Sequence, residues 1–143
     1  MLQPVITAGG PYNLAATGGA IVVAAEAPEL FIDFHEALIN YYLSILNGGD
    51  SSGVADAQTA LQTVSAIAAQ VGVPDQVIAE FDLNSAQQYL TEATNAWVSR
   101  KVEGRESTST PEFVYHDTKL QISGNNGQEL FESIQSGIAA LGG

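Results

Sequence analysis

The chain has 143 residues, of which 45% are hydrophobic, which suits one domain with a buried core and excludes a wholly disordered protein. Sixteen acidic residues against four lysines and arginines give a formal charge of −12, which disfavours binding to nucleic acids or to anionic membrane surfaces. The chain has no cysteine, which excludes disulfides, thiolate catalysis and cysteine-ligated metals.

Residues 1–27 are predicted to form an extended apolar arm. Residues 4–7 have a strand-like composition, the glycine pairs at 9–10 and 18–19 interrupt the chain, and residues 20–25 form a second apolar run. That run is too short to span a bilayer, and no lysine or arginine precedes it as in a signal peptide. The arm either folds back as two strands on its own core or packs on a neighbouring subunit. In the second case, its contact residues are Val5, Ile6, Ile21, Val22 and Val23.

Residues 28–47 are predicted to form the central helix of the fold. Pro28 suits its first turn, and Gly48 follows it as a left-handed stop. At about 100° per residue, the polar side chains fall in one narrow arc. This arc contains Glu29, Asp33, Glu36, Asn40, Ser44 and Asn47. A helix with so narrow a polar stripe needs cover on most of its circumference, so we expect the other segments to wrap around it.

Further helices are predicted along the rest of the chain. Apolar residues at helical spacing indicate helices over residues 52–71, 75–81 and 128–141. Asn84, followed three residues later by Gln87, resembles a capping box, which predicts another helix that ends at Arg100 and Lys101.

Residues 112–123 are predicted to form a pair of short strands. The strands cover residues 112–116 and 119–123, with Asp117 and Thr118 at the turn. The expected fold is therefore mainly α (α+β). About four helices pack round the central helix 28–47, and a small antiparallel β element comes from the N-terminal arm and residues 112–123. The expected division is an arm, residues 1–27, and one helical domain, residues 28–143.

His35 is the polar residue of the central helix that lies outside the polar arc. It stands on the same helix as Tyr41 and Tyr42, and His116 is the second histidine of the chain. Together these four residues define a candidate pocket for a small ligand or a metal ion. No sequence spacing brings His35 and His116 together, and a histidine of the core or of an interface is the simpler interpretation.

Familiar catalytic signatures are missing from the sequence. It contains no Gly-x-Ser-x-Gly, no His-Glu-x-x-His and no phosphate-binding loop. We therefore expect a non-enzymatic structural subunit without a cofactor. Its partners would be proteins, as a homo-oligomer or a larger assembly, with the arm making the subunit contacts. The acidic, lysine-poor composition favours a virion (capsid, decoration or tail-type) or another extracellular assembly. The alternative is a small-ligand- or metal-binding helical domain with its pocket near His35.

Overall fold

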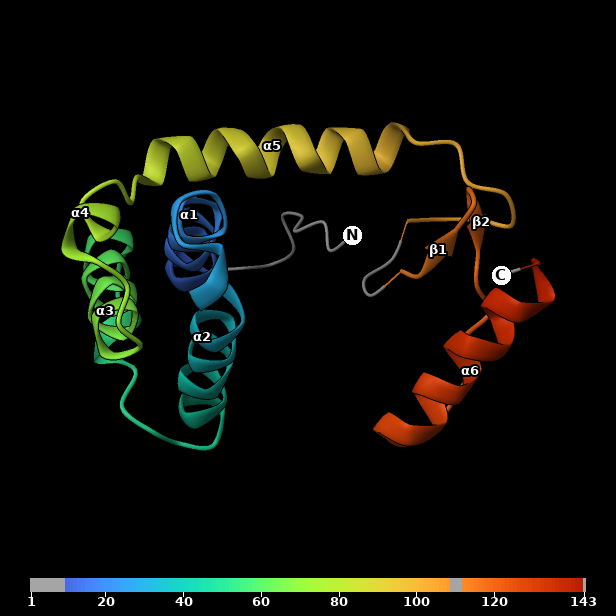
Figure 1. The fold of residues 1–143 in the computed structure, drawn as a ribbon, viewed down its shortest axis with the longest axis horizontal. Helices are drawn as coiled ribbons and strands as arrows, with labels where there is room; N and C mark the ends of the chain where they lie inside the picture. The colour runs from blue at the N-terminus through green and yellow to red at the C-terminus, as the bar shows by residue number, and fades with distance from the viewer. Residues whose placement is uncertain (1–9, 109–111, 143) are drawn as a thin grey trace. The chain divides into compact units, whose positions relative to one another are not determined.

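The computed structural model describes residues 10–108 and 112–142 (Figure 1). Within these ranges the chain forms helices and one two-stranded antiparallel sheet, so the predicted mainly α class is confirmed. The elements are α1 (Pro11–Glu26), α2 (Phe31–Leu46), α3 (Ala57–Gln70), α4 (Asp75–Ile78), α5 (Leu83–Ser99), β1 (Val114–Tyr115), β2 (Thr118–Lys119) and α6 (Gly127–Ala140). None of the helices in these two ranges is long and apolar enough to cross a membrane.

Contacts within the chain divide it into two compact units, Met1–Asn95 and Ala96–Gly143, here called unit 1 and unit 2. Unit 1 contains α1 to α4 and most of α5. Unit 2 contains the end of α5, the β hairpin and α6. These units are defined by internal contacts, so the expectation that residues 28–143 fold as one domain stays a prediction.

Helix α1 corrects the prediction of an extended N-terminal arm, which is wrong for residues 11–26. The arm therefore contributes no strand from this segment, and residues 1–9 lie outside the described residues. Pro11 at the first position favours the helix, since its φ is already helical and it lacks only an N–H that would be unpaired there. Gly18 and Gly19, which we took for chain breakers, are both buried inside the helix.

Gly19 explains why α1 tolerates this glycine pair. A Cβ atom at Gly19 would lie 3.0 Å from Val64 Cγ1, 3.1 Å from Phe34 Cζ and 3.1 Å from Phe81 Cε2. Glycine in a helix costs about 1 kcal/mol relative to alanine. Here it lets the side chains of Val64, Phe34 and Phe81 approach the backbone of α1, and their packing offsets that cost.

The central position in unit 1 belongs to α1 rather than to residues 28–47. Helix α1 contacts α2, α3 and α4, and it lies among them in Figure 1. A helix that is apolar on all sides, as α1 is, becomes buried. Residues 28–46 do form helix, as a 3₁₀ turn (Pro28–Leu30) followed by α2, but only Phe34 and Leu38 of α2 are buried.

The remaining helices of unit 1 begin close to their predicted positions. A 3₁₀ turn (Ser52–Val54) precedes α3, and the Asp56 carboxylate accepts a hydrogen bond from the Thr59 N–H at the start of that helix. The predicted capping box of the next helix is displaced by two residues. Asp82, not Asn84, caps α5, because its carboxylate accepts hydrogen bonds from the N–H and hydroxyl of Ser85.

In unit 2, β1 and β2 form a tight hairpin, with Val114 paired with Lys119. The turn residues are His116 and Asp117, with φ of 46° and 60°, one position earlier than predicted. Two successive positive φ values match the right-handed twist of a two-residue hairpin. Helix α6 follows, with the Asn126 side chain accepting a hydrogen bond from the Glu129 N–H.

Candidate functional site

Helix α2 carries the most prominent exposed apolar surface of unit 1. Ile32 and Leu46 are 68% and 64% exposed, and three neighbours between them are about half exposed. At about 100° per residue, these side chains share one arc of the helix roughly 100° wide. We call this surface the α2 face, and it consists of Ile32, Ile39, Tyr42, Leu43 and Leu46.

The α2 face lies on another side of the helix from its core contacts. Phe34 and Leu38 point into the core of unit 1. The sequence correctly placed a narrow polar arc on this helix, but it predicted cover over the whole apolar remainder. The core of unit 1 covers only part of the apolar surface of α2, and the rest of that surface stays exposed to solvent. Monomeric proteins rarely expose contiguous apolar patches of this kind, and such patches commonly mark interaction sites.

Three tyrosines support the C-terminal half of α2. The Tyr12 ring of α1 stacks on Tyr42 and lies tilted against Tyr41, with 5.5 Å between ring centroids in both pairs. The buried Tyr12 hydroxyl donates a 2.7 Å hydrogen bond to the Leu38 carbonyl oxygen, and burial raises the pKa of Tyr12 well above its ordinary value of 10.0. These contacts fix the Tyr42 ring at the edge of the α2 face.

The predicted pocket around His35 stays a prediction, and its four residues lie in two units. His35 is half-buried and stacks on Phe31, with 5.8 Å between ring centroids. Tyr41 and Tyr42 gather around Tyr12 instead, and His116 lies in the hairpin turn of unit 2. Across residues 10–108 and 112–142, no three His, Asp or Glu side chains are grouped so that they could hold a metal ion.

Three of the predicted arm contacts, Ile21, Val22 and Val23, lie in helix α1 and differ in exposure. Val23 is fully buried in the core of unit 1, so its side chain has no surface left for a neighbouring subunit. Ile21 and Val22 are half-buried. Val5 and Ile6 lie outside the described residues.

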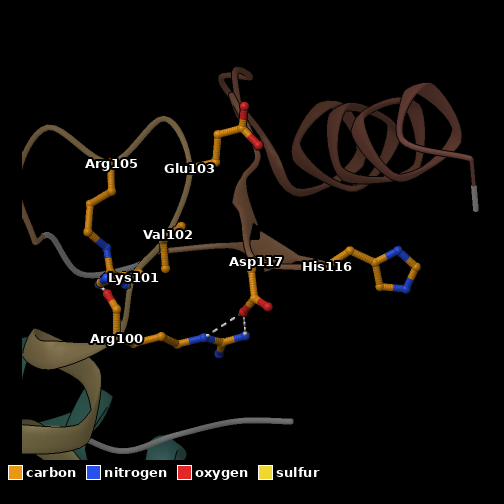
Figure 2. Close-up of a pocket in the computed structure, with 7 residues that line it drawn as sticks. All are labelled: Arg100, Lys101, Val102, Glu103, Arg105, His116 and Asp117. Atoms are coloured by element: carbon orange, nitrogen blue, oxygen red, sulfur yellow. Dashed lines mark hydrogen bonds and ion pairs between the residues drawn. The ribbon is translucent and has the colours of Figure 1, made fainter.

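A hollow of about 530 Å³ lies in unit 2, next to the hairpin turn. Its lining includes Arg100, Arg105, His116 and Asp117. Arg100 forms an exposed ion pair with Asp117, with 2.6 Å between Nη2 and Oδ1. Figure 2 shows this pair, with the His116 imidazole pointing away from it. Lys101 and Glu103 also line the hollow, so its lining carries charges of both signs.

Unit 2 also contains a buried ion pair that the sequence did not predict, and one of its members, Arg105, lines this hollow. The side chains of Arg105 and Glu112 are 8% and 3% exposed and are joined by paired hydrogen bonds. The Trp97 indole N–H also donates to Glu112, at 2.9 Å. Lys119 Nζ lies 3.8 Å from the same carboxylate, and Arg105 donates to the Trp97 and Arg100 carbonyls.

The hydrogen bonds from Arg105 and Trp97 and the charges of Arg105 and Lys119 outweigh desolvation and lower the pKa of Glu112 below its ordinary value of 4.5. Glu112 is thus ionised at neutral pH, and the cluster is a charged structural element of unit 2. No sequence pattern marks it, because its members are spread over residues 97–119 without the periodicity of a helix or a strand.

No family model, no curated protein and no solved structure matches this chain. Its function is therefore inferred from its own residues.

Proposed function

We propose that this chain is a non-enzymatic structural subunit that assembles with copies of itself, and that the α2 face makes a subunit contact. The observation that carries the proposal is the exposure of five large side chains in one arc of α2. The acidic, lysine-poor composition supports a virion or another extracellular particle as the setting.

The free energy available from the α2 face suits a contact between two such faces. Covering the exposed half of an aliphatic or aromatic side chain contributes about 1 kcal/mol. Five side chains on each of two copies give on the order of 10 kcal/mol, which falls within the estimated cost of association. We therefore expect weak, concentration-dependent association from this face alone, which further contacts would strengthen in a complete assembly.

Helix α6 offers a second apolar surface, in unit 2. Leu130 and Leu141 are about two-fifths exposed and Phe131 is 55% exposed, while Ile134 and Ile138 on the same side are partly covered. At helical spacing these residues share one arc of α6. Each unit thus carries an apolar helical surface, which supports a role in contacts with other protein chains.

Charge opposes the association of unit 1 with copies of itself. Residues 1–95 contain ten acidic residues and neither lysine nor arginine. Because salt screens repulsion between exposed charges, we expect added salt to strengthen self-association. An assembly held by surface ion pairs would respond in the opposite direction.

Analytical ultracentrifugation of the full chain tests the proposal, over a range of concentrations and at low and high salt. We expect Ile39→Ser to raise the dissociation constant about tenfold or more, since both copies lose apolar contact. Val98→Ser is the matched control, because Val98 is 56% exposed but lies outside the α2 face. A chain that stays monomeric at every concentration, or that loses association equally in both variants, contradicts the proposal.

A further inference from the structure

The charged residues of the chain are divided unequally between the two units. Unit 1 contains ten acidic residues and neither lysine nor arginine, whereas unit 2 contains six acidic residues and all four lysines and arginines. All ten acidic side chains of unit 1 are exposed. Since unit 1 provides no lysine or arginine to pair with them, these carboxylates repel one another through solvent.

Hydrogen bonds within unit 1 hold three of these charges without neutralising them. Asp50, Asp56 and Asp82 each accept hydrogen bonds from a serine or threonine two or three residues later. These neutral donors lower the pKa of all three carboxyls, so the groups stay ionised at neutral pH. The fold of unit 1 therefore retains these negative charges.

Three further acidic residues follow one another at the start of α2. Glu29 stands in the turn before the helix, and Asp33 and Glu36 come four and three residues later. Residues at these spacings are neighbours on a helix surface, where like charges are destabilising. Asp33 thus has a like-charged neighbour on each side.

The charges of unit 2 include pairs of opposite sign. Arg105 and Glu112 form a buried ion pair, and Arg100 pairs with Asp117 at the surface. Salt weakens the attraction between exposed opposite charges and screens a buried pair much less. Added salt therefore has far less repulsion to relieve in unit 2 than in unit 1.

We propose that ionic strength controls the stability of unit 1. A diffuse atmosphere of cations screens the repulsion among its carboxylates and stabilises its fold, while unit 2 gains little or is weakened. Net charge of one sign destabilises a compact state through self-repulsion, and salt reduces that repulsion. The effect requires no ion at a fixed position, and it does not depend on self-association of the chain.

Hydrogen exchange followed by mass spectrometry tests the proposal, because it reports on segments of each unit separately. The full chain is measured in sodium chloride from about 0.01 M to about 0.15 M, over which the Debye length falls from about 30 Å to about 8 Å. We expect exchange in α1 and α3 to slow about threefold or more, and exchange in residues 97–105 to change much less. Equal responses in the two units, or faster exchange in α1 and α3, would overturn the proposal.

Two double variants test whether the acidic residues cause this response. Glu29→Gln combined with Glu36→Gln removes both like-charged neighbours of Asp33. In this variant we expect slower exchange of unit 1 at low salt and a smaller effect of added salt. Glu103→Gln combined with Glu106→Gln is the matched control, because it removes the same charge from exposed positions in unit 2. An unchanged salt response in the first variant, or the same change of α1 and α3 in both, contradicts the proposal.

Two further comparisons separate screening from other effects of salt. Potassium chloride should act as sodium chloride does at equal concentration, because screening does not distinguish the two cations. A requirement for one of them would mean a bound ion and would overturn the diffuse mechanism. The measurement is also repeated at lower protein concentration. A salt effect that disappears on dilution would belong to self-association, which overturns this inference and leaves the proposed function standing.

Discussion

Gly19 of α1 and Phe34 of α2 are packed so closely that a Cβ atom at position 19 would lie 3.1 Å from Phe34 Cζ. This approach places a fully buried aromatic ring of α2 against the backbone of α1. It also fixes which side of α2 faces inward, and so which side presents the α2 face to solvent.

Gly19→Ala is expected to destabilise unit 1. An added methyl group would crowd Val64 and Phe81 as well as Phe34, and overpacking of this kind typically costs 1–3 kcal/mol. Alanine has a higher helix propensity than glycine, which stabilises the helix by about 1 kcal/mol, so we expect the free energy of unfolding to fall by about 1 kcal/mol in total. Urea denaturation followed by circular dichroism measures the change. Gly127→Ala is the control, because no heavy atom lies within 4 Å of its added Cβ, and an equal loss there would contradict the packing explanation.

Gly18 and Gly19 also show which part of the fold could not be predicted from the sequence. Periodicity located α2, α3 and α6 to within a few residues, because each has polar and apolar sides. Helix α1 is enclosed by its neighbours and therefore has no polar side from which a helical period could be read. Without knowledge of those neighbours, Gly18 and Gly19 resemble residues that interrupt a helix. The prediction for α2 was incomplete for another reason. The sequence identified the apolar side of this helix, but it could not show how much of that side the core would cover.

Breaking the Arg105–Glu112 pair is expected to destabilise unit 2. Glu112→Gln leaves the buried Arg105 guanidinium without its counter-charge, and such a loss costs about 3 kcal/mol or more. Trp97, the only tryptophan, donates to the same carboxylate, so its fluorescence follows the unfolding of this cluster. Glu106→Gln is the control, because Glu106 is exposed. If both variants unfold at the same urea concentration as the natural chain, the pair contributes nothing to stability.

Acid is expected to weaken unit 2 through the same carboxylate. Because the pKa of Glu112 is lower in the folded chain than its ordinary value of 4.5, the ionised group stabilises the fold at every pH above 4.5. That contribution is lost as the pH falls below 4.5 and through the lowered pKa. Trp97 fluorescence during urea titrations from pH 7 downwards should show decreasing stability in this window. In Glu112→Gln the decrease should be smaller, and an unchanged acid response would assign it to other carboxylates.

The cap of α5 distinguishes the structure from the sequence-based prediction. Asp82→Ala removes the acceptor for the Ser85 hydroxyl and N–H, so we expect a lower thermal midpoint. The same two hydrogen bonds lower the pKa of Asp82, so the difference between the natural chain and Asp82→Ala should shrink in acid. Asn84→Ala changes the residue that the sequence identified as the cap, and its midpoint should match that of the natural chain. The opposite ranking would restore Asn84 as the cap.

One substitution in the hairpin turn is expected to stabilise unit 2. His116 and Asp117 both have positive φ, a conformation that costs most residues about 1 kcal/mol and that asparagine adopts more readily. His116→Asn should therefore raise the stability of unit 2, by less than 1 kcal/mol, because it also removes the stacking of His116 on Tyr115 at 4.1 Å between ring centroids. Asp117 is left in place, since its carboxylate pairs with Arg100. Urea titration with Trp97 fluorescence measures the gain. His116→Val is the opposing variant: a β-branched residue resists positive φ, so equal stability of the two variants would mean that the turn geometry does not limit stability.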